Sequence, residues 1–121
     1  MDQKTVLIVD DTPENLTIMS EILKPFYMVK AAPKGIVALK IAMTKPDLIL
    51  LDILMPEMDG FQVCEKLKAQ EETKEIPVIF ISGNSGQEEV DAGMALGAVN
   101  YLFKPIEAEK LIEAVKQIIG S

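Results

Sequence analysis

The sequence contains no histidine, no arginine and no tryptophan, and its only cysteine is Cys64. Without histidine, the chain lacks the commonest general base and the usual protein ligand of zinc and copper. Without arginine, it lacks the forked donor that proteins use on bases and phosphates, and all twelve cations are lysines. Carboxylates, lysine, hydroxyl groups and backbone groups must therefore carry any chemistry.

Other absences bear on where the protein works. A single cysteine excludes an internal disulfide and suits a reducing compartment. No apolar run approaches the roughly 18 residues that span a membrane, and the first residues lack the pattern of a secretion signal. The formal charge of −7 argues against direct contact with nucleic acid. We therefore expect a cytoplasmic protein that binds neither membranes nor DNA directly.

The 121 residues suffice for one domain, with a core expected at about 5–119. Apolar runs predict strands at 5–9, 26–32, 48–52, 76–81 and 99–103. Helical spacing predicts helices that begin at 13, 35, 60, about 86 and 107, one after each strand. This fivefold alternation predicts an α/β domain whose parallel sheet is covered on both faces.

The same spacing predicts which helical side chains face the sheet. The second helix, 35–43, places Ile36, Leu39, Ala42 and Met43 on one side. The fourth helix carries Val90, Met94 and Leu96, and residues 85–88 form the pattern of a capping box at its start.

Polar residues stand where four of these strands end. The run at 46–60, PDLILLDILMPEMDG, stays apolar until Asp52, and the other strand ends carry Asp10 with Asp11, Ser82 and Lys104. Ligands of open parallel sheets bind beyond the carboxyl ends of the strands, so these groups are expected at one site.

Clustered carboxylates repel one another unless a cation lies among them, and Mg²⁺ takes carboxylate oxygens as ligands. Lys104 suits a phosphate, and the Ser82 hydroxyl can donate to one. With a metal and a lysine present, a carboxylate can attack phosphorus and form an aspartyl phosphate. Phosphoryl transfer depends mainly on positioning and charge neutralisation, so it needs no histidine base here.

Four motifs carry a family resemblance: VLIVDD at 6–11, PDLILLDILMPEMDG at 46–60, ISG at 81–83 and GAVNYLFKP at 97–105. In this order they resemble the receiver domain of two-component response regulators of the chemotaxis-regulator type. The resemblance implies a flavodoxin-like, doubly wound (βα)5 fold with strand order 2-1-3-4-5. It also implies a phosphoacceptor that assists its own phosphorylation and dephosphorylation rather than an enzyme.

The resemblance also implies roles for individual residues. Asp52 would be the phosphoacceptor, and Mg²⁺ (or Mn²⁺) would be held by Asp11 and Asp52, by Asp10 mainly through water, and by the backbone carbonyl of Leu54. Ser82 and Lys104 would bind the phosphoryl group, Tyr101 would then turn inward, and Pro105 would follow a cis peptide bond. Leu54 and Asn84 would tune dephosphorylation, with apolar Leu54 giving a long-lived phosphoryl group.

The partners implied are a sensor histidine kinase or phosphotransfer protein as donor, and a protein target or output domain. The target would contact the fourth helix, fifth strand and fifth helix, and a phosphorylation-dependent homodimer is a further option. The sequence fits a free-standing receiver and equally a piece of a longer protein.

Three other readings stay open. A flavin-binding enzyme would need donors for the flavin phosphate after the first strand, where Asp10 and Asp11 instead repel it. A receiver-like protein that is never phosphorylated is disfavoured because every reactive position is filled. A hydrolase with an aspartate nucleophile would call for a cap domain or substrate pocket, and the sequence resembles neither.

Overall fold

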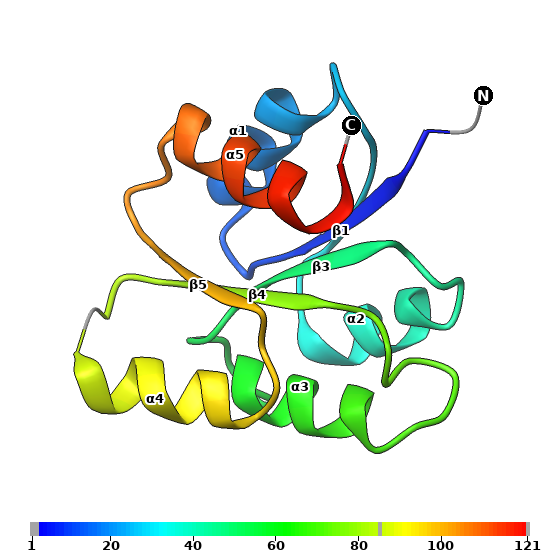
Figure 1. Cartoon of the computed structure of the whole chain (residues 1–121). Coiled ribbons are helices and arrows are strands. Elements are labelled where there is room, and N and C mark those ends of the chain that lie inside the picture. Colours follow the sequence, from blue (N-terminus) through cyan, green and yellow to red (C-terminus); the bar gives the residue numbers. More distant parts are fainter. Residues whose placement is uncertain (1–2, 85, 121) are drawn as a thin grey trace.

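The computed structural model describes residues 3–84 and 86–120, which form five strands and five helices in strict alternation (Figure 1). The strands are β1 (Thr5–Val9), β2 (Met28–Ala32), β3 (Leu48–Asp52), β4 (Val78–Ser82) and β5 (Asn100–Phe103). The helices are α1 (Pro13–Leu23), α2 (Gly35–Ala42), α3 (Gly60–Lys68), α4 (Gln87–Ala95) and α5 (Ala108–Ile119). The described helices include none long and apolar enough to cross a membrane.

All five strands pair in parallel in the order β2-β1-β3-β4-β5, which confirms the flavodoxin-like, doubly wound topology. Every residue of β3 and β4 is buried, because helices cover both faces of these inner strands. The edge strand β2 has only Ala32 fully buried, which accounts for its mixed sequence. The most apolar strands therefore lie inside the sheet.

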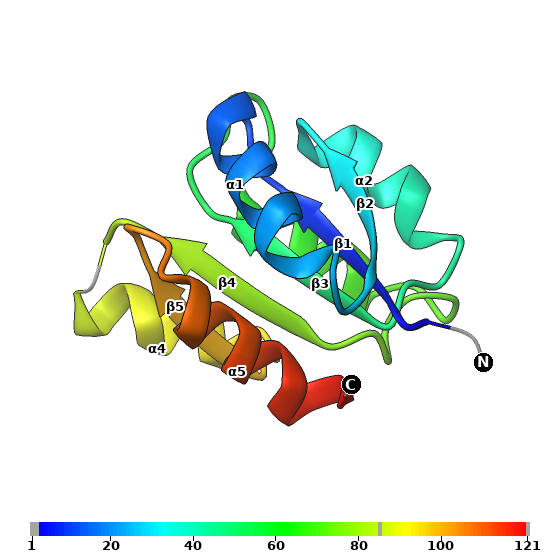
Figure 2. The same cartoon turned by 90° about the horizontal axis from the view of Figure 1, so that it is seen from above.

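Helices form a layer on each side of this sheet (Figures 1 and 2). Helices α1 and α5 lie together on one face. Their side chains Met19, Leu23, Leu111 and Val115 pack on the buried side chains of β1, β3 and β4 that point toward this face. Helices α2, α3 and α4 cover the other face, where Val63, Cys64 and Leu67 join the core. The sheet is thus held from both sides, and its carboxyl edge is fixed by the packing.

Three of the predicted inward side chains are exposed, and these predictions were wrong. Ile36 and Met43 of the α2 segment are 49% and 48% exposed, and Met94 is 43% exposed. Helix α2 is buried through small residues, since Ala38 and Ala42 join the core and Gly35 packs against Val63 of α3. Helix α4 approaches the sheet through Gly93. Small residues let the helix axis come close, which turns the larger neighbouring side chains toward water.

Gly93 shows how close the α4 contact is. A β-carbon at this position would lie 2.9 Å from Cδ2 of Phe80, and Gly93 is the one buried residue of α4. Helix α4 is therefore the least embedded of the helices.

Several element ends differ from the predicted ones by one or two residues. Residues 26–27, 76–77 and 99 lie outside the strands, and Glu107 is the N-cap of α5 rather than its first residue. Phe26 and Tyr27 continue the turn after α1, where both backbone N–H groups donate to the carbonyl of Leu23. The proposed capping box includes Ser85, which lies outside the described residues.

Candidate functional site

The register of the sheet brings the polar strand ends together. Val9 pairs with Leu51, so Asp10 and Asp11 emerge beside Asp52. Asp52 pairs with Ile81, and Ser82 pairs with Phe103, the residue before Lys104. Residues separated by up to 94 positions in the chain therefore share one edge, as the sequence predicted.

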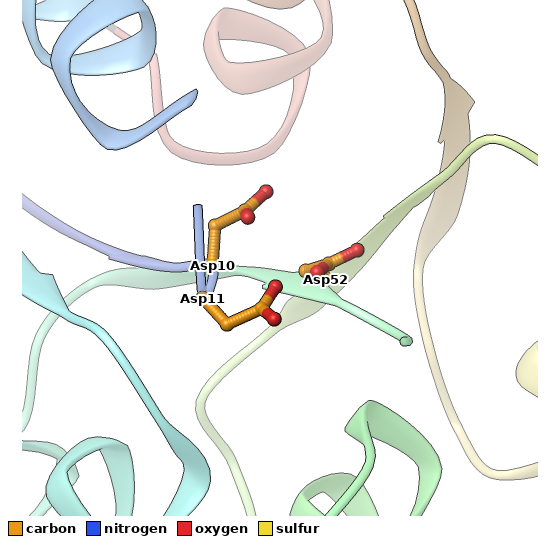
Figure 3. Close-up of side chains that lie close together, drawn as sticks. All are labelled: Asp10, Asp11 and Asp52. Atoms are coloured by element: carbon orange, nitrogen blue, oxygen red, sulfur yellow. The ribbon is translucent and has the colours of Figure 1, made fainter. Parts of the chain in front are cut away.

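Three carboxylates gather at this edge (Figure 3). Asp10, Asp11 and Asp52 each offer an oxygen, and these three atoms lie within 4.8 Å of one another. Asp10 and Asp52 are buried, whereas Asp11 is exposed. The oxygen-only donor set fits a hard divalent cation such as Mg²⁺ or Mn²⁺, and exposed Asp11 leaves the cluster open to solvent.

Lys104 bridges the two buried acids. Its Nζ lies 3.1 Å from Oδ2 of Asp10 and 3.2 Å from Oδ1 of Asp52. Burial lowers the pKa of Lys104, but its hydrogen bonds to Asp10 and the charges of both acids outweigh burial, so this pKa lies above its ordinary value. Lys104 is therefore a permanent cation at the centre of the site.

One lysine does not compensate for the crowding of acids around Asp52. Burial, and then the charge of Asp10, raise the pKa of the Asp52 carboxyl group to about 6, against the lowering effect of Lys104. The ionised form of Asp52 is thus costly in this setting, and a further positive charge among the three acids would stabilise it.

Asp10 is held by a set of donors that includes one residue the sequence analysis missed. Its Oδ1 accepts from the backbone N–H of Thr12 at 2.9 Å, and its Oδ2 accepts from the side-chain amide of Asn15 at 3.3 Å. In the sequence, the feature that pointed to this contact was the position of Asn15 five residues after Asp10, across the start of α1.

The loop that follows Asp52 is fixed by two features. Asp59 and Gln62 form a capping box at the start of α3, with reciprocal bonds of 2.9 Å. Gly60 lies against the end of β3, where an added β-carbon would stand 2.3 Å from the carbonyl oxygen of Asp52. The Gly60 N–H also donates to the carbonyl of Ile53 at 2.8 Å. These contacts fix the backbone directly after Asp52, and thereby the position from which its side chain extends.

Ser82, Asn84 and Tyr101 form a connected group at the end of β4. The N–H of Asn84 donates to the hydroxyl oxygen of Ser82 at 3.0 Å, and the Tyr101 hydroxyl donates to the carbonyl of Asn84 at 3.0 Å. The side-chain oxygen of Asn84 accepts from the N–H of Gly86, the N-cap of α4, at 2.8 Å. Tyr101 already lies inward in this structure, buried against the ring of Phe80. A turn of Tyr101 inward on phosphorylation is therefore not shown and stays a prediction.

Two other residues of the predicted site are Pro105, whose cis bond is confirmed, and Leu54, whose role stays a prediction. The Lys104–Pro105 peptide bond is cis. Leu54 lies two residues after Asp52 and is 71% exposed, the largest exposure among the large apolar side chains of residues 3–84 and 86–120. A side chain of this kind near Asp52 offers no polar group to an approaching water.

Known proteins with similar sequences agree with the family resemblance of the four motifs. The sequence profile of the response regulator receiver domain matches residues 6–116. A probable cyclic di-GMP phosphodiesterase of Vibrio cholerae is 50% identical over 107 residues, which cover 88% of this chain and 24% of that protein. The chain thus spans about a quarter of the length of that relative.

Two solved structures are similar over nearly the whole chain. Chemotaxis protein CheY4 of Vibrio cholerae has a TM-score of 0.91 and 30% identity, covering 96% of this chain and 98% of that one. The receiver domain of sensor histidine kinase PA1611 from Pseudomonas aeruginosa has a TM-score of 0.88 and 30% identity, covering all of both chains. That structure has a magnesium ion coordinated in its active-site cleft.

The close approach of Gly60 generates a stability prediction. Gly60→Ala forces a methyl group against the backbone of Asp52, so we expect the free energy of unfolding in urea to fall by about 1–3 kcal/mol. Gly83→Ala is the matched control because nothing lies within 4 Å of its added β-carbon. Its stability should stay within about 0.5 kcal/mol of the parent. Equal stabilities for the two variants would contradict the assigned role of Gly60.

Proposed function

Because the chain belongs to the response regulator receiver domain family, we propose that Asp52 accepts a phosphoryl group from a histidine kinase or phosphotransfer protein. The observation that carries this proposal is the position of Asp52. It is buried at the end of the central strand, between two further acids and a lysine that contacts it. This arrangement serves phosphoryl transfer better than any other chemistry available to the chain.

In the proposed reaction, a carboxylate oxygen of Asp52 forms a bond to phosphorus, and the bond between phosphorus and the donor's histidine nitrogen breaks. Lys104 pairs with the phosphoryl oxygens, and the Ser82 hydroxyl donates a hydrogen bond to them. Asp10, Asp11, Asp52 and the carbonyl of Leu54 would hold Mg²⁺ or Mn²⁺, with Asp10 acting mainly through water. The bound cation supplies charge neutralisation for the acids and the incoming phosphoryl group.

We further propose that the signal leaves through α4, β5 and α5. The Ser82–Asn84–Tyr101 hydrogen bonds connect the phosphoryl site to the N-cap of α4 and to β5. This side of the molecule exposes Met94, Val99 and Phe103, three large apolar side chains that a protein partner can cover. The partner is an output domain or a separate protein, and a phosphorylation-dependent homodimer would use the same surface.

The proposed role is that of a phosphoacceptor in the cytoplasm, not of an enzyme with its own substrate. The relative named as a phosphodiesterase is about four times as long as the matched region, so its activity is not carried over to this chain. A flavin-binding alternative is disfavoured because Asp10 and Asp11 stand where a flavin phosphate would need donors. The charge of −7 supports the absence of direct DNA contact.

The first test is chemical labelling. The protein incubated with Mg²⁺ and acetyl phosphate should gain one phosphoryl group, located on Asp52 by mass spectrometry, and Asp52→Asn should gain none. Asp91→Asn is the matched control because Asp91 is exposed on α4. Equal labelling of Asp52→Asn and the parent would exclude Asp52 as the acceptor, and co-purified flavin would favour the enzyme alternative.

The second test concerns the lifetime of the phosphoryl group. Leu54 offers no hydrogen bond to orient an attacking water, so Leu54→Asn should release phosphate at least several-fold faster than the parent. Leu54→Val is the control, because it keeps the apolar character and should leave the rate close to that of the parent. Phosphate release timed after removal of excess donor measures both rates, and an unchanged rate in Leu54→Asn would reject this role for Leu54.

A further inference from the structure

We propose that Asn15 is a positioning residue that keeps Asp10 oriented for the cation when Lys104 turns to the phosphoryl group. The inference rests on the proposed function, because it assigns a task within that site. The observation that carries it is the set of hydrogen bonds that Asp10 accepts, because one of them comes from Asn15, a residue outside the sequence motifs.

Asp10 is fully buried, and its carboxylate accepts from three donors, two at the start of α1 and one after β5. Oδ1 accepts from the backbone of Thr12 at 2.9 Å, and Oδ2 is shared between Asn15 Nδ2 at 3.3 Å and Lys104 Nζ at 3.1 Å. A carboxylate only accepts, so the amide of Asn15 must present its NH₂ group. The orientation of the Asn15 side chain is thereby fixed.

Lys104 is a shared and movable donor. Its Nζ lies nearly as close to Asp52 as to Asp10, at 3.2 Å and 3.1 Å, and its side chain is 25% exposed. A phosphoryl group on Asp52 adds about −1.5 to −2 charges and three acceptor oxygens, which draw the lysine toward them. Oδ2 of Asp10 then keeps one donor of the two, the amide of Asn15.

The side chain of Asn15 cannot reach toward a phosphoryl group on Asp52 as the longer side chain of Lys104 can. It lies in the first turn of α1, its own N–H donates to the carbonyl of Thr12 at 3.0 Å, and its short side chain is half-buried. The neutral amide also restrains Asp10 without cancelling its charge. Asp10 therefore stays attractive to a cation, whereas a second lysine at this place would compete with the cation.

The test compares Mg²⁺ affinities, measured by calorimetry, in the parent, Asn15→Leu, Asn15→Ala and Asn15→Gln. Leu keeps the branched shape and removes the donor, and we expect its Mg²⁺ Kd to rise about tenfold, as for other groups that orient a metal ligand. Asn15→Ala should behave similarly, and Asn15→Gln, which keeps a donor, should recover most of the affinity. Thr17→Val, exposed on the same helix, is the control and should bind as the parent does.

A double-mutant cycle tests the link to Lys104. In a Lys104→Met background Asp10 has already lost the movable donor, so Asn15→Leu should raise the Mg²⁺ Kd by a larger factor than in the parent. Urea unfolding of each variant confirms that the folded protein is compared. A Kd of the two donor-less variants equal to that of the parent, in both backgrounds, would overturn the role of Asn15 and leave the proposed function intact. Absence of Mg²⁺ binding by the parent would instead overturn the proposed function, and the inference with it.

Discussion

Mutual repulsion of three carboxylates at the end of a buried sheet is the constraint on which this structure depends. Asp10, Asp11 and Asp52 offer oxygens within 4.8 Å of one another, and two of the three side chains are buried. Lys104 pairs with both buried acids, yet the pKa of Asp52 still rises to about 6, chiefly because of burial. The folded chain therefore holds a cluster of acids that a divalent cation would stabilise.

The free-energy cost of crowding these acids is offset by the packing of the rest of the domain. The sheet edge is held by the fully buried strands β3 and β4 and by the helices on both faces. The close approach of Gly60 to Asp52 fixes the path of the loop directly after Asp52. Helix α4 is different, because Gly93 is its one buried residue and Val90 is only partly buried against the core. The clustered acids and Lys104 thus stand on the best-packed part of the molecule, and the helix joined to them through Asn84 is the one with least packing to oppose a shift.

Much of the fold and of the site could be predicted from sequence, because parallel strands bury both faces and end at one edge. This reasoning placed Asp52, Ser82 and Lys104 together, and the family resemblance supplied the strand order and the cis bond at Pro105. It failed for Ile36, Met43 and Met94, because apolar spacing does not show that a helix approaches a sheet through its small residues. It also missed the contact of Asn15 with Asp10 and the close approach of Gly60 to Asp52, because these rest on the direction of a side-chain amide and on the path of the backbone.

The central claim is that this cluster binds a divalent cation and thereby lets Asp52 carry a phosphoryl group. Its most direct test is a crystal structure after soaking in Mg²⁺ and beryllofluoride, an analogue of the phosphoryl group. The account predicts a cation among Asp10, Asp11 and Asp52, beryllofluoride on an oxygen of Asp52, and Lys104 turned toward it. A site without cation or beryllofluoride, or beryllofluoride bound to another residue, would contradict it.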